Sequence, residues 1–129
     1  MTASQYKNII QWTLFLNKNS ENNSKLTIVR NMFNNLGVAF PNADIDDCIK
    51  ILNEGTYLGW RKCSAEEAQK FSNGGIPSIA INSSNIIVIV PDSSVDILTS
   101  NKEVVEMKNS NVKHITEISE QMIFFAYTY

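Results

Sequence analysis

The fold is decided by residues 60–91, WRKCSAEEAQKFSNGGIPSIAINSSNIIVIVP. In the first half of this stretch, Ser64 and Glu67 have the spacing of a capping box, in which each residue bonds the backbone amide of the other. A pair of glycines follows, and glycine commonly ends a helix. The pattern therefore predicts a short helix over about 65–72. The residues of this helix expected in the core are Ala65, Ala68 and Phe71.

The second half of the stretch contains two apolar runs joined by a polar turn. The runs cover 76–81 and 86–90, and Asn82-Ser83-Ser84-Asn85 connects them. Short apolar runs on either side of such a turn are typical of a β-hairpin. Because both runs are almost continuously apolar, we expect each strand to be covered on both faces and to be central in its sheet.

Three helices are expected before this stretch. Apolar residues at helical spacing predict a helix over 3–18, a second that begins at the N-cap Ser24 and ends at Gly37, and a third over about 43–53. Pro41-Asn42 is expected to open the third helix, and Gly55 to close it. The apolar face of the third helix comprises Ile45, Cys48, Ile49 and Leu52.

Further strands are expected after the hairpin, over 103–107 and 122–129. The intervening segment 113–120 fits either a strand end or a helical turn. Helices followed by antiparallel strands indicate an α+β fold, in which the N-terminal helices pack on one face of the sheet.

The length of 129 residues corresponds to a single domain, 1–129, with a helical part over about 1–73 and a sheet part over about 76–129. A net charge of −2 and a pI of 5.3 argue against a nucleic-acid partner, which requires clustered basic residues. No apolar run approaches the length of a membrane span, so the composition is that of a soluble globular protein.

The start of the chain, residues 1–7, lacks the basic and apolar regions of a signal peptide. This predicts a cytoplasmic protein or one exported by a signal-independent route. Two cysteines and one histidine match no zinc-binding spacing, so we expect neither a metal nor another cofactor.

The segment 60–91 resembles part of the papain-like cell-wall amidases and endopeptidases, the NlpC and CHAP groups. The likeness covers about residues 24–92 and implies a papain-like core. The residues that carry it are Trp60, Ala68-Gln69, Ser72-Asn73-Gly74 and the two apolar strands, of which the second is followed by Pro91.

In this family, a catalytic cysteine begins a helix and a histidine begins the second strand of the hairpin. The matching positions here hold Leu26 or Thr27, depending on a one-residue register, and Asn85. Asp92 is the candidate for the third polar residue of the family's site. A neutral amide cannot accept a thiol proton near pH 7, and neither leucine nor an unassisted threonine is a competent nucleophile. The resemblance therefore implies a degenerate member that has lost catalysis. It also implies that the N-terminus of the helix starting at Ser24 lies beside Asn85.

The cysteines and the histidine that are present leave a second possibility, an active cysteine hydrolase with relocated residues. Cys63 directly precedes the N-cap Ser64, and a helix N-terminus lowers the pKa of a nearby thiol. Cys48 lies on the apolar stripe of the third helix and is expected to be a core thiol. Either cysteine would have to come within about 3–4 Å of His114, the only histidine.

Three hypotheses for function follow. The first is a catalytically degenerate papain-like domain that binds a peptidoglycan-like peptide, a glycan or a protein partner. The second is an active cysteine peptidase or amidase that uses Cys63 or Cys48 with His114. The third is a small intracellular interaction protein unrelated to this family. The candidate binding residues are Trp60, Asn82, Ser84 and Asn85.

Overall fold

The structure is a computed structural model of the chain, and the α+β class predicted from the sequence is confirmed. It describes residues 1–16, 24–54, 59–91, 103–106, 111–114 and 121–128. In these residues there are four helices, α1 (Ala3–Leu16), α2 (Lys25–Asn35), α3 (Ile45–Asn53) and α4 (Ala65–Asn73). The same residues form six strands, β1 (Trp60–Cys63), β2 (Ser78–Ile81), β3 (Ile86–Ile89), β4 (Glu103–Glu106), β5 (Asn111–His114) and β6 (Ile123–Tyr127).

The strands form one antiparallel sheet in the order β1-β6-β2-β3-β4-β5. β2 and β3 pair as the predicted hairpin, with Ile79 opposite Val88. Every residue of these two strands is buried, and both strands have a neighbour on each side. The prediction of two central strands covered on both faces is confirmed.

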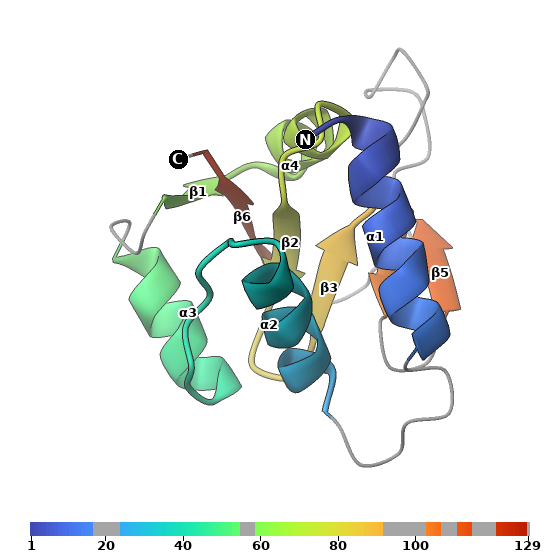
Figure 1. Ribbon diagram of the computed structural model, residues 1–129. Helices are drawn as coiled ribbons and strands as arrows, with labels where there is room; N and C mark the ends of the chain where they lie inside the picture. The colour runs from blue at the N-terminus through green and yellow to red at the C-terminus, as the bar shows by residue number, and fades with distance from the viewer. Residues whose placement is uncertain (17–23, 55–58, 92–102, 107–110, 115–120, 129) are drawn as a thin grey trace.

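The helices lie on both faces of the sheet, in two unequal layers. α1, α2 and α3 stand side by side over one face, as Figure 1 shows, and they share a core with Ile79, Val88 and Phe125 of the strands. α4 covers the other face, where Ala68 packs against Ala80 and Ile87. The expectation of one helical face therefore holds for the three N-terminal helices and not for α4.

α2 begins and ends where the sequence predicts. The Ser24 side chain accepts a hydrogen bond from the Thr27 amide, as an N-cap does, and Gly37 has the positive φ of 75° that follows many helices. Val29 and Phe33 are fully buried on its apolar stripe. This stripe holds the helix against the sheet and so positions its first turn.

α3 starts later than expected. Its N-cap is Asp44, whose side chain accepts from the Asp47 amide at 2.9 Å, so Pro41-Asn42 does not open the helix. Aspartate is a preferred N-cap residue, because its side chain accepts a hydrogen bond from an amide of the first helical turn. Asp44 is therefore a stronger start signal than the preceding proline. Gly55, the expected end, lies outside the described residues.

α4 has the predicted capping box but buries a different face. Ser64 and Glu67 bond each other's backbone amides at 3.0 and 3.1 Å. Ala68 is buried as expected, whereas Ala65 and Phe71 are only partly buried and the polar Gln69 and Ser72 are completely buried. The reason is that these two side chains bond β3 and the residue after it. The bonds run from Gln69 Nε2 to the Val90 carbonyl at 2.9 Å and from Ser72 Oγ to the Ile89 carbonyl at 2.7 Å.

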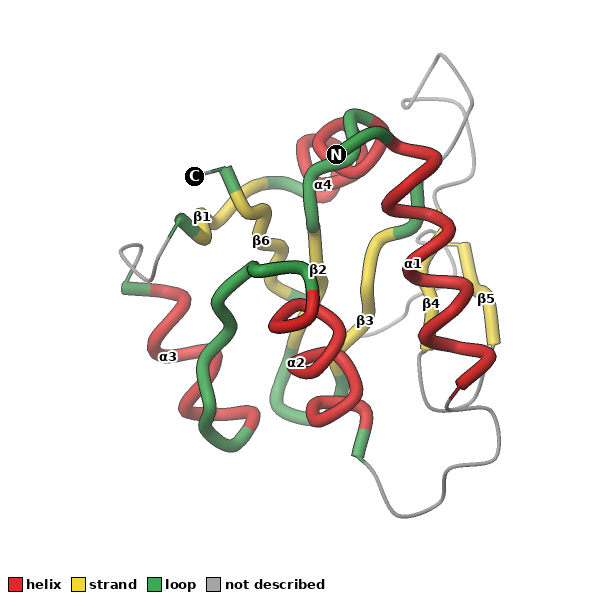
Figure 2. The backbone as a smooth tube through the Cα atoms, viewed as in Figure 1, coloured by secondary structure: helices red, strands yellow, loops and turns green. Residues whose placement is uncertain are grey.

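The other predicted helix and strands are present but shorter than predicted. α1 covers most of 3–18, β4 most of 103–107 and β6 most of 122–129. Of the ambiguous segment 113–120, the first two residues belong to β5 and the others lie outside the described residues. β1 lies between α3 and α4 in the chain and pairs with β6, with Trp60 opposite Tyr127. The path of the chain in Figure 2 shows β1 between α3 and α4.

Candidate functional site

An open cleft of about 600 Å³ lies where the first turn of α2, the β2–β3 turn and the start of α3 meet. Its walls combine apolar, neutral polar and charged side chains. They include Lys25, Leu26, Arg30, Asp44, Ser84 and Asn85. The resemblance implies that the family's nucleophile and base would lie here, and with it that the two elements carrying them lie side by side.

Lys25 and Asn85 connect the two walls of the cleft. The Lys25 ammonium donates to Asn85 Oδ1 at 2.8 Å, and both residues are partly buried. The expected juxtaposition of the α2 start and the β3 start is therefore confirmed. Sequence reasoning missed Lys25, because a lysine in a first helical turn looks like a solvated surface residue. The only signal was its position directly after the N-cap.

The β2–β3 turn holds Asn85 in place through Asn82. Asn82 Oδ1 accepts from the amides of Ser84 and Asn85, both at 2.8 Å, and its Nδ2 donates to the Gln121 carbonyl at 3.3 Å. Asn82 thus acts as the organiser of an Asx-type turn. Ser84 is exposed at the rim of the cleft. Asn85 Oδ1 also accepts from the Ile86 amide at 3.0 Å, which fixes the carboxamide oxygen toward the protein.

Leu26 and Thr27 both line the cleft. These are the two residues that the resemblance aligns with the family's nucleophile, depending on a one-residue register. The Thr27 hydroxyl lies 3.0 Å from the Ser24 hydroxyl, and the Thr27 amide donates to the same oxygen at 3.2 Å. Thr27 is therefore occupied in capping α2. Leucine has no nucleophilic group, and the neutral carboxamide of Asn85 is not a base that could activate the Thr27 hydroxyl near pH 7.

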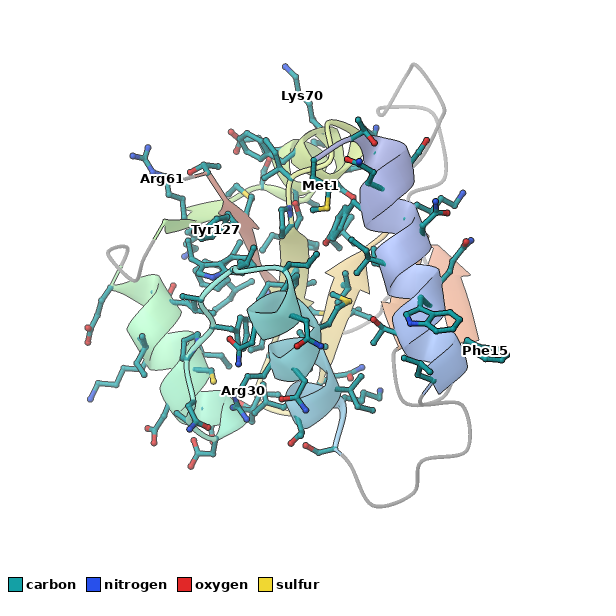
Figure 3. All side chains as sticks on the ribbon, in the orientation of Figure 1. Met1, Phe15, Arg30, Arg61, Lys70 and Tyr127 are labelled. Atoms are coloured by element: carbon teal, nitrogen blue, oxygen red, sulfur yellow. The ribbon has the colours of Figure 1, made fainter. Side chains whose placement is uncertain are left out.

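Arg30 and Asp44 form the third wall and were also missed by the sequence reasoning. Arg30 Nε donates to the Pro41 carbonyl at 2.9 Å and its Nη2 donates to the Ala43 carbonyl at 2.6 Å. Figure 3 shows Arg30 between α2 and α3. Arg30 therefore fixes the connection between these helices while keeping its positive charge at the cleft.

The pKa of Cys63 is shifted in the opposite direction from the one expected. Burial, together with the nearby Glu67 carboxylate, raises the pKa of Cys63 to about 11. The capping box accounts for this, because it folds Glu67 back toward the residue before the helix. A thiol with a raised pKa is a poor nucleophile at neutral pH.

Cys48 is completely buried within the core, as the sequence predicted. Its Sγ lies 3.4 Å from the Ala43 carbonyl, and burial raises the pKa of this thiol. Cys48 therefore belongs to the packing of α3.

His114 cannot pair with Cys63 in this fold. Cys63 belongs to β1 and His114 to β5, and these strands are the two edges of the sheet. Five strand-to-strand steps separate them, or about 24 Å at the usual strand spacing of about 4.8 Å. α3, which carries Cys48, lies on the β1 side of the molecule (Figure 1).

Trp60 is not available as a binding residue, because it is completely buried. Its indole nitrogen donates to the Ala39 carbonyl at 2.6 Å, and its ring contacts those of Phe33, Phe40 and Tyr127 at centroid distances of 5.3, 5.7 and 5.5 Å. A tryptophan in a sequence motif marks either a surface anchor or a core anchor, and tertiary packing makes it the latter here. Asp92, the candidate third polar residue, lies outside the described residues.

A different part of the surface carries exposed aromatic side chains. Trp12 and Phe15 on α1 stack with a centroid distance of 5.6 Å and are 61% and 67% exposed. Phe15 points away from the molecule in Figure 3. In the described part of the chain, no cluster of three or more histidine, cysteine or acidic side chains could hold a metal ion. The helices described are too short or too polar to cross a bilayer.

Comparisons of the chain with protein-family models, with curated proteins and with solved structures found no match.

Proposed function

We propose that this protein is a catalytically inactive binding domain, related in architecture to papain-like cell-wall peptidases, that holds a peptide in the cleft between α2 and the β2–β3 turn. The observation that carries the proposal is the 2.8 Å contact between the Lys25 ammonium and Asn85 Oδ1. The resemblance implies that the family's thiol and imidazole would meet at this position. An ammonium and a carboxamide can bind a polar ligand, but they cannot activate a nucleophile.

The alternative of an active cysteine hydrolase is disfavoured by three features of the described residues. Cys48 is enclosed in the core, the pKa of Cys63 is raised, and β1 and β5 lie at opposite edges of the sheet. None of these features opposes binding. The cleft itself has the size of a small-ligand site, with apolar walls and a few polar groups.

The proposal is tested by adding soluble peptidoglycan fragments to ¹⁵N-labelled protein. We expect chemical-shift changes at Lys25, Leu26 and Asn85, and no new fragment by mass spectrometry after prolonged incubation. The exposed Ser84 at the rim provides a blocking variant, Ser84→Trp, and Ser4→Trp on α1 is the matched control. Only the first should abolish the shifts.

Cleavage of the fragments would overturn the proposal, as would unchanged spectra at the cleft. Shifts confined to α1 would instead favour the third hypothesis, an interaction protein unrelated to this family, because Trp12, Phe15 and Leu16 are large exposed side chains there.

A further inference from the structure

A second hollow lies on the side of α2 that faces α1. It has a volume of about 380 Å³, and its floor is made by Ile28 and Met32, which are buried in the core. Ile9 of α1 and Leu36, the C-cap residue of α2, add to its apolar lining. The volume is that of a small-ligand pocket. None of the described residues lines both this hollow and the cleft, so the two are separate.

One wall of the hollow is an exposed aromatic ring. The Trp12 side chain lines the hollow, although most of its surface is exposed. Phe15 stacks on the indole, with a centroid distance of 5.6 Å and an angle of 19° between the two planes. This stacking holds the indole in one orientation. A ligand that lies against it therefore gains a large, rigid contact surface at a low cost in conformational entropy.

The rim of the hollow carries two carboxamides from α2. Asn31 and Asn35 are four residues apart, which places them on the same side of the helix, and both are exposed. Within the described residues, neither side chain makes a hydrogen bond to the protein. Each carboxamide offers both a donor and an acceptor. Two such groups one turn apart fit a ligand with neighbouring hydroxyls, because a hydroxyl also donates and accepts.

The charge of the lining narrows the class of ligand. Every described residue that lines the hollow is apolar or neutral and polar. A charged ligand would lose hydration here without gaining a counter-charge. The face of an aromatic ring carries negative charge density and attracts C–H groups. A sugar ring combines a face of C–H groups with an edge of hydroxyls, whereas a wholly apolar ligand would make no use of the two carboxamides.

We propose that the hollow between α1 and α2 binds an uncharged pyranose sugar. The C–H face of the sugar lies on the Trp12 indole, and its hydroxyls exchange hydrogen bonds with Asn31 and Asn35. This site is additional to the proposed peptide cleft and does not depend on it. Because its residues come from both helices, sugar binding shifts resonances of α1 and α2 together.

The test is a titration of ¹⁵N-labelled protein with three ring compounds. Methyl β-glucoside is the neutral sugar, methyl β-glucuronide has a carboxylate in place of the hydroxymethyl group, and cyclohexanol is a carbon ring with one hydroxyl. We expect the glucoside to shift the indole N–H resonance of Trp12, which Trp12→Phe assigns, and the carboxamide resonances of Asn31 and Asn35. The indole resonance of the buried Trp60 should not move. The glucuronide should bind several-fold more weakly than the glucoside.

Variants of the rim and of the wall assign the contacts. Asn31→Ala and Asn35→Ala should each weaken glucoside binding about fivefold, the loss typical of one neutral hydrogen bond, and leave cyclohexanol binding unchanged. Asn34→Ala is the matched control, because Asn34 is an exposed asparagine of the same helix that does not line the hollow. Trp12→Ala should abolish glucoside binding, and amide resonances that stay in place away from α1 show that this variant is folded.

Four results would overturn the proposal. The first is an unchanged Trp12 indole resonance up to the solubility limit of the glucoside. The second is an equal effect of Asn35→Ala and Asn34→Ala, and the third is equal affinity for the glucoside and the glucuronide. The fourth is a Trp12 resonance that moves with protein concentration in the absence of sugar, which would assign this surface to contact with a second copy of the chain. Each of these results leaves the peptide cleft untouched, because the cleft is tested by its own residues.

Discussion

The ammonium nitrogen of Lys25 lies 2.8 Å from Oδ1 of Asn85, although 60 residues separate them in the chain. This contact joins the first turn of α2 to the first residue before β3. The resemblance to papain-like enzymes implies that these two elements correspond to those that carry a nucleophile and a base. In this chain they carry a cation and an amide, and the proposed binding function rests on these two groups.

Restoring a thiol and an imidazole tests whether the two elements are in catalytic register. In the double variant Leu26→Cys, Asn85→His, the imidazole should lower the pKa of the new thiol and speed its reaction with iodoacetamide about tenfold or more at pH 7. The single variant Leu26→Cys is the control, and Thr27→Cys with Asn85→His tests the neighbouring register. Equal rates with and without the histidine in both registers would contradict the family alignment.

The native thiols should be slow to react at neutral pH. Because burial and Glu67 raise the pKa of Cys63 to about 11, only a very small fraction of this thiol is ionised at pH 7.4. Labelling of Cys63, followed by peptide mapping, should therefore rise about tenfold for each pH unit between pH 7 and 10. Glu67→Gln removes a neighbouring negative charge while keeping a residue that can complete the capping box. This variant should lower the pKa of Cys63 and speed its labelling. Rapid labelling of the unmodified protein at pH 7 would contradict the raised pKa of Cys63.

Glu67 should also make stability depend on pH. Its hydrogen bonds with the Ser64 backbone amide and side chain lower the pKa of Glu67 below its ordinary value. A carboxyl group whose pKa is lower in the folded state contributes stability above its unfolded-state pKa and loses it as the pH falls through the folded-state value. Urea unfolding at pH 7 and pH 3 should show a larger loss for the unmodified protein than for Glu67→Gln. Identical losses would contradict a structural role for the ionised carboxylate.

Ser72 should stabilise the protein through one buried hydrogen bond. Its hydroxyl donates to the Ile89 carbonyl at 2.7 Å, and the side chain is completely buried. Ser72→Ala leaves that carbonyl without this donor, which costs about 1–3 kcal/mol of unfolding free energy. Ser83→Ala, at an exposed turn position, should change it by less than about 0.5 kcal/mol. Chemical denaturation measures both, and equal effects would contradict the assigned packing of α4 on β3.

The two tryptophans should differ in their accessibility to solvent. Trp12 is 61% exposed, whereas Trp60 is completely buried with its indole nitrogen bonded to Ala39. In Trp12→Phe the remaining fluorescence should be blue-shifted and resistant to iodide quenching. In Trp60→Phe it should be red-shifted and readily quenched. The second variant also loses a buried hydrogen bond, so its folding should be checked by circular dichroism. Similar quenching of two folded variants would contradict the core position of Trp60.

The predictions that the structure confirms depend on residues close together in the sequence. The capping box of Ser64 and Glu67 spans three residues, and the β2–β3 hairpin needs only two apolar runs and a polar turn. The prediction of which α4 residues are buried was wrong, because Gln69 and Ser72 are polar and were expected on the surface. They are buried because carbonyls at the end of β3, some 17 to 21 residues later, accept their hydrogen bonds. No periodicity in α4 itself contains that information.

The same limit applied to the site. The meeting of α2 with the hairpin was expected from a resemblance, but the contribution of Lys25 and Arg30 was not, because their roles depend on which side chain faces them. The predicted direction of the Cys63 pKa shift was also wrong. Its position before a helix suggested a lower value, while burial and the returning Glu67 side chain raise it.

The amino-acid sequence alone determined the helix starts at Ser24 and Ser64 and the hairpin, because each depends on contacts within a few positions. It also showed directly that position 85 holds asparagine and not histidine. Only the tertiary structure decided that α4 covers the second face of the sheet, that Trp60 is in the core, and that Cys63 and His114 lie at opposite edges. These outcomes follow from strand order and helix docking, which bring distant residues together or keep them apart according to the packing of the whole core.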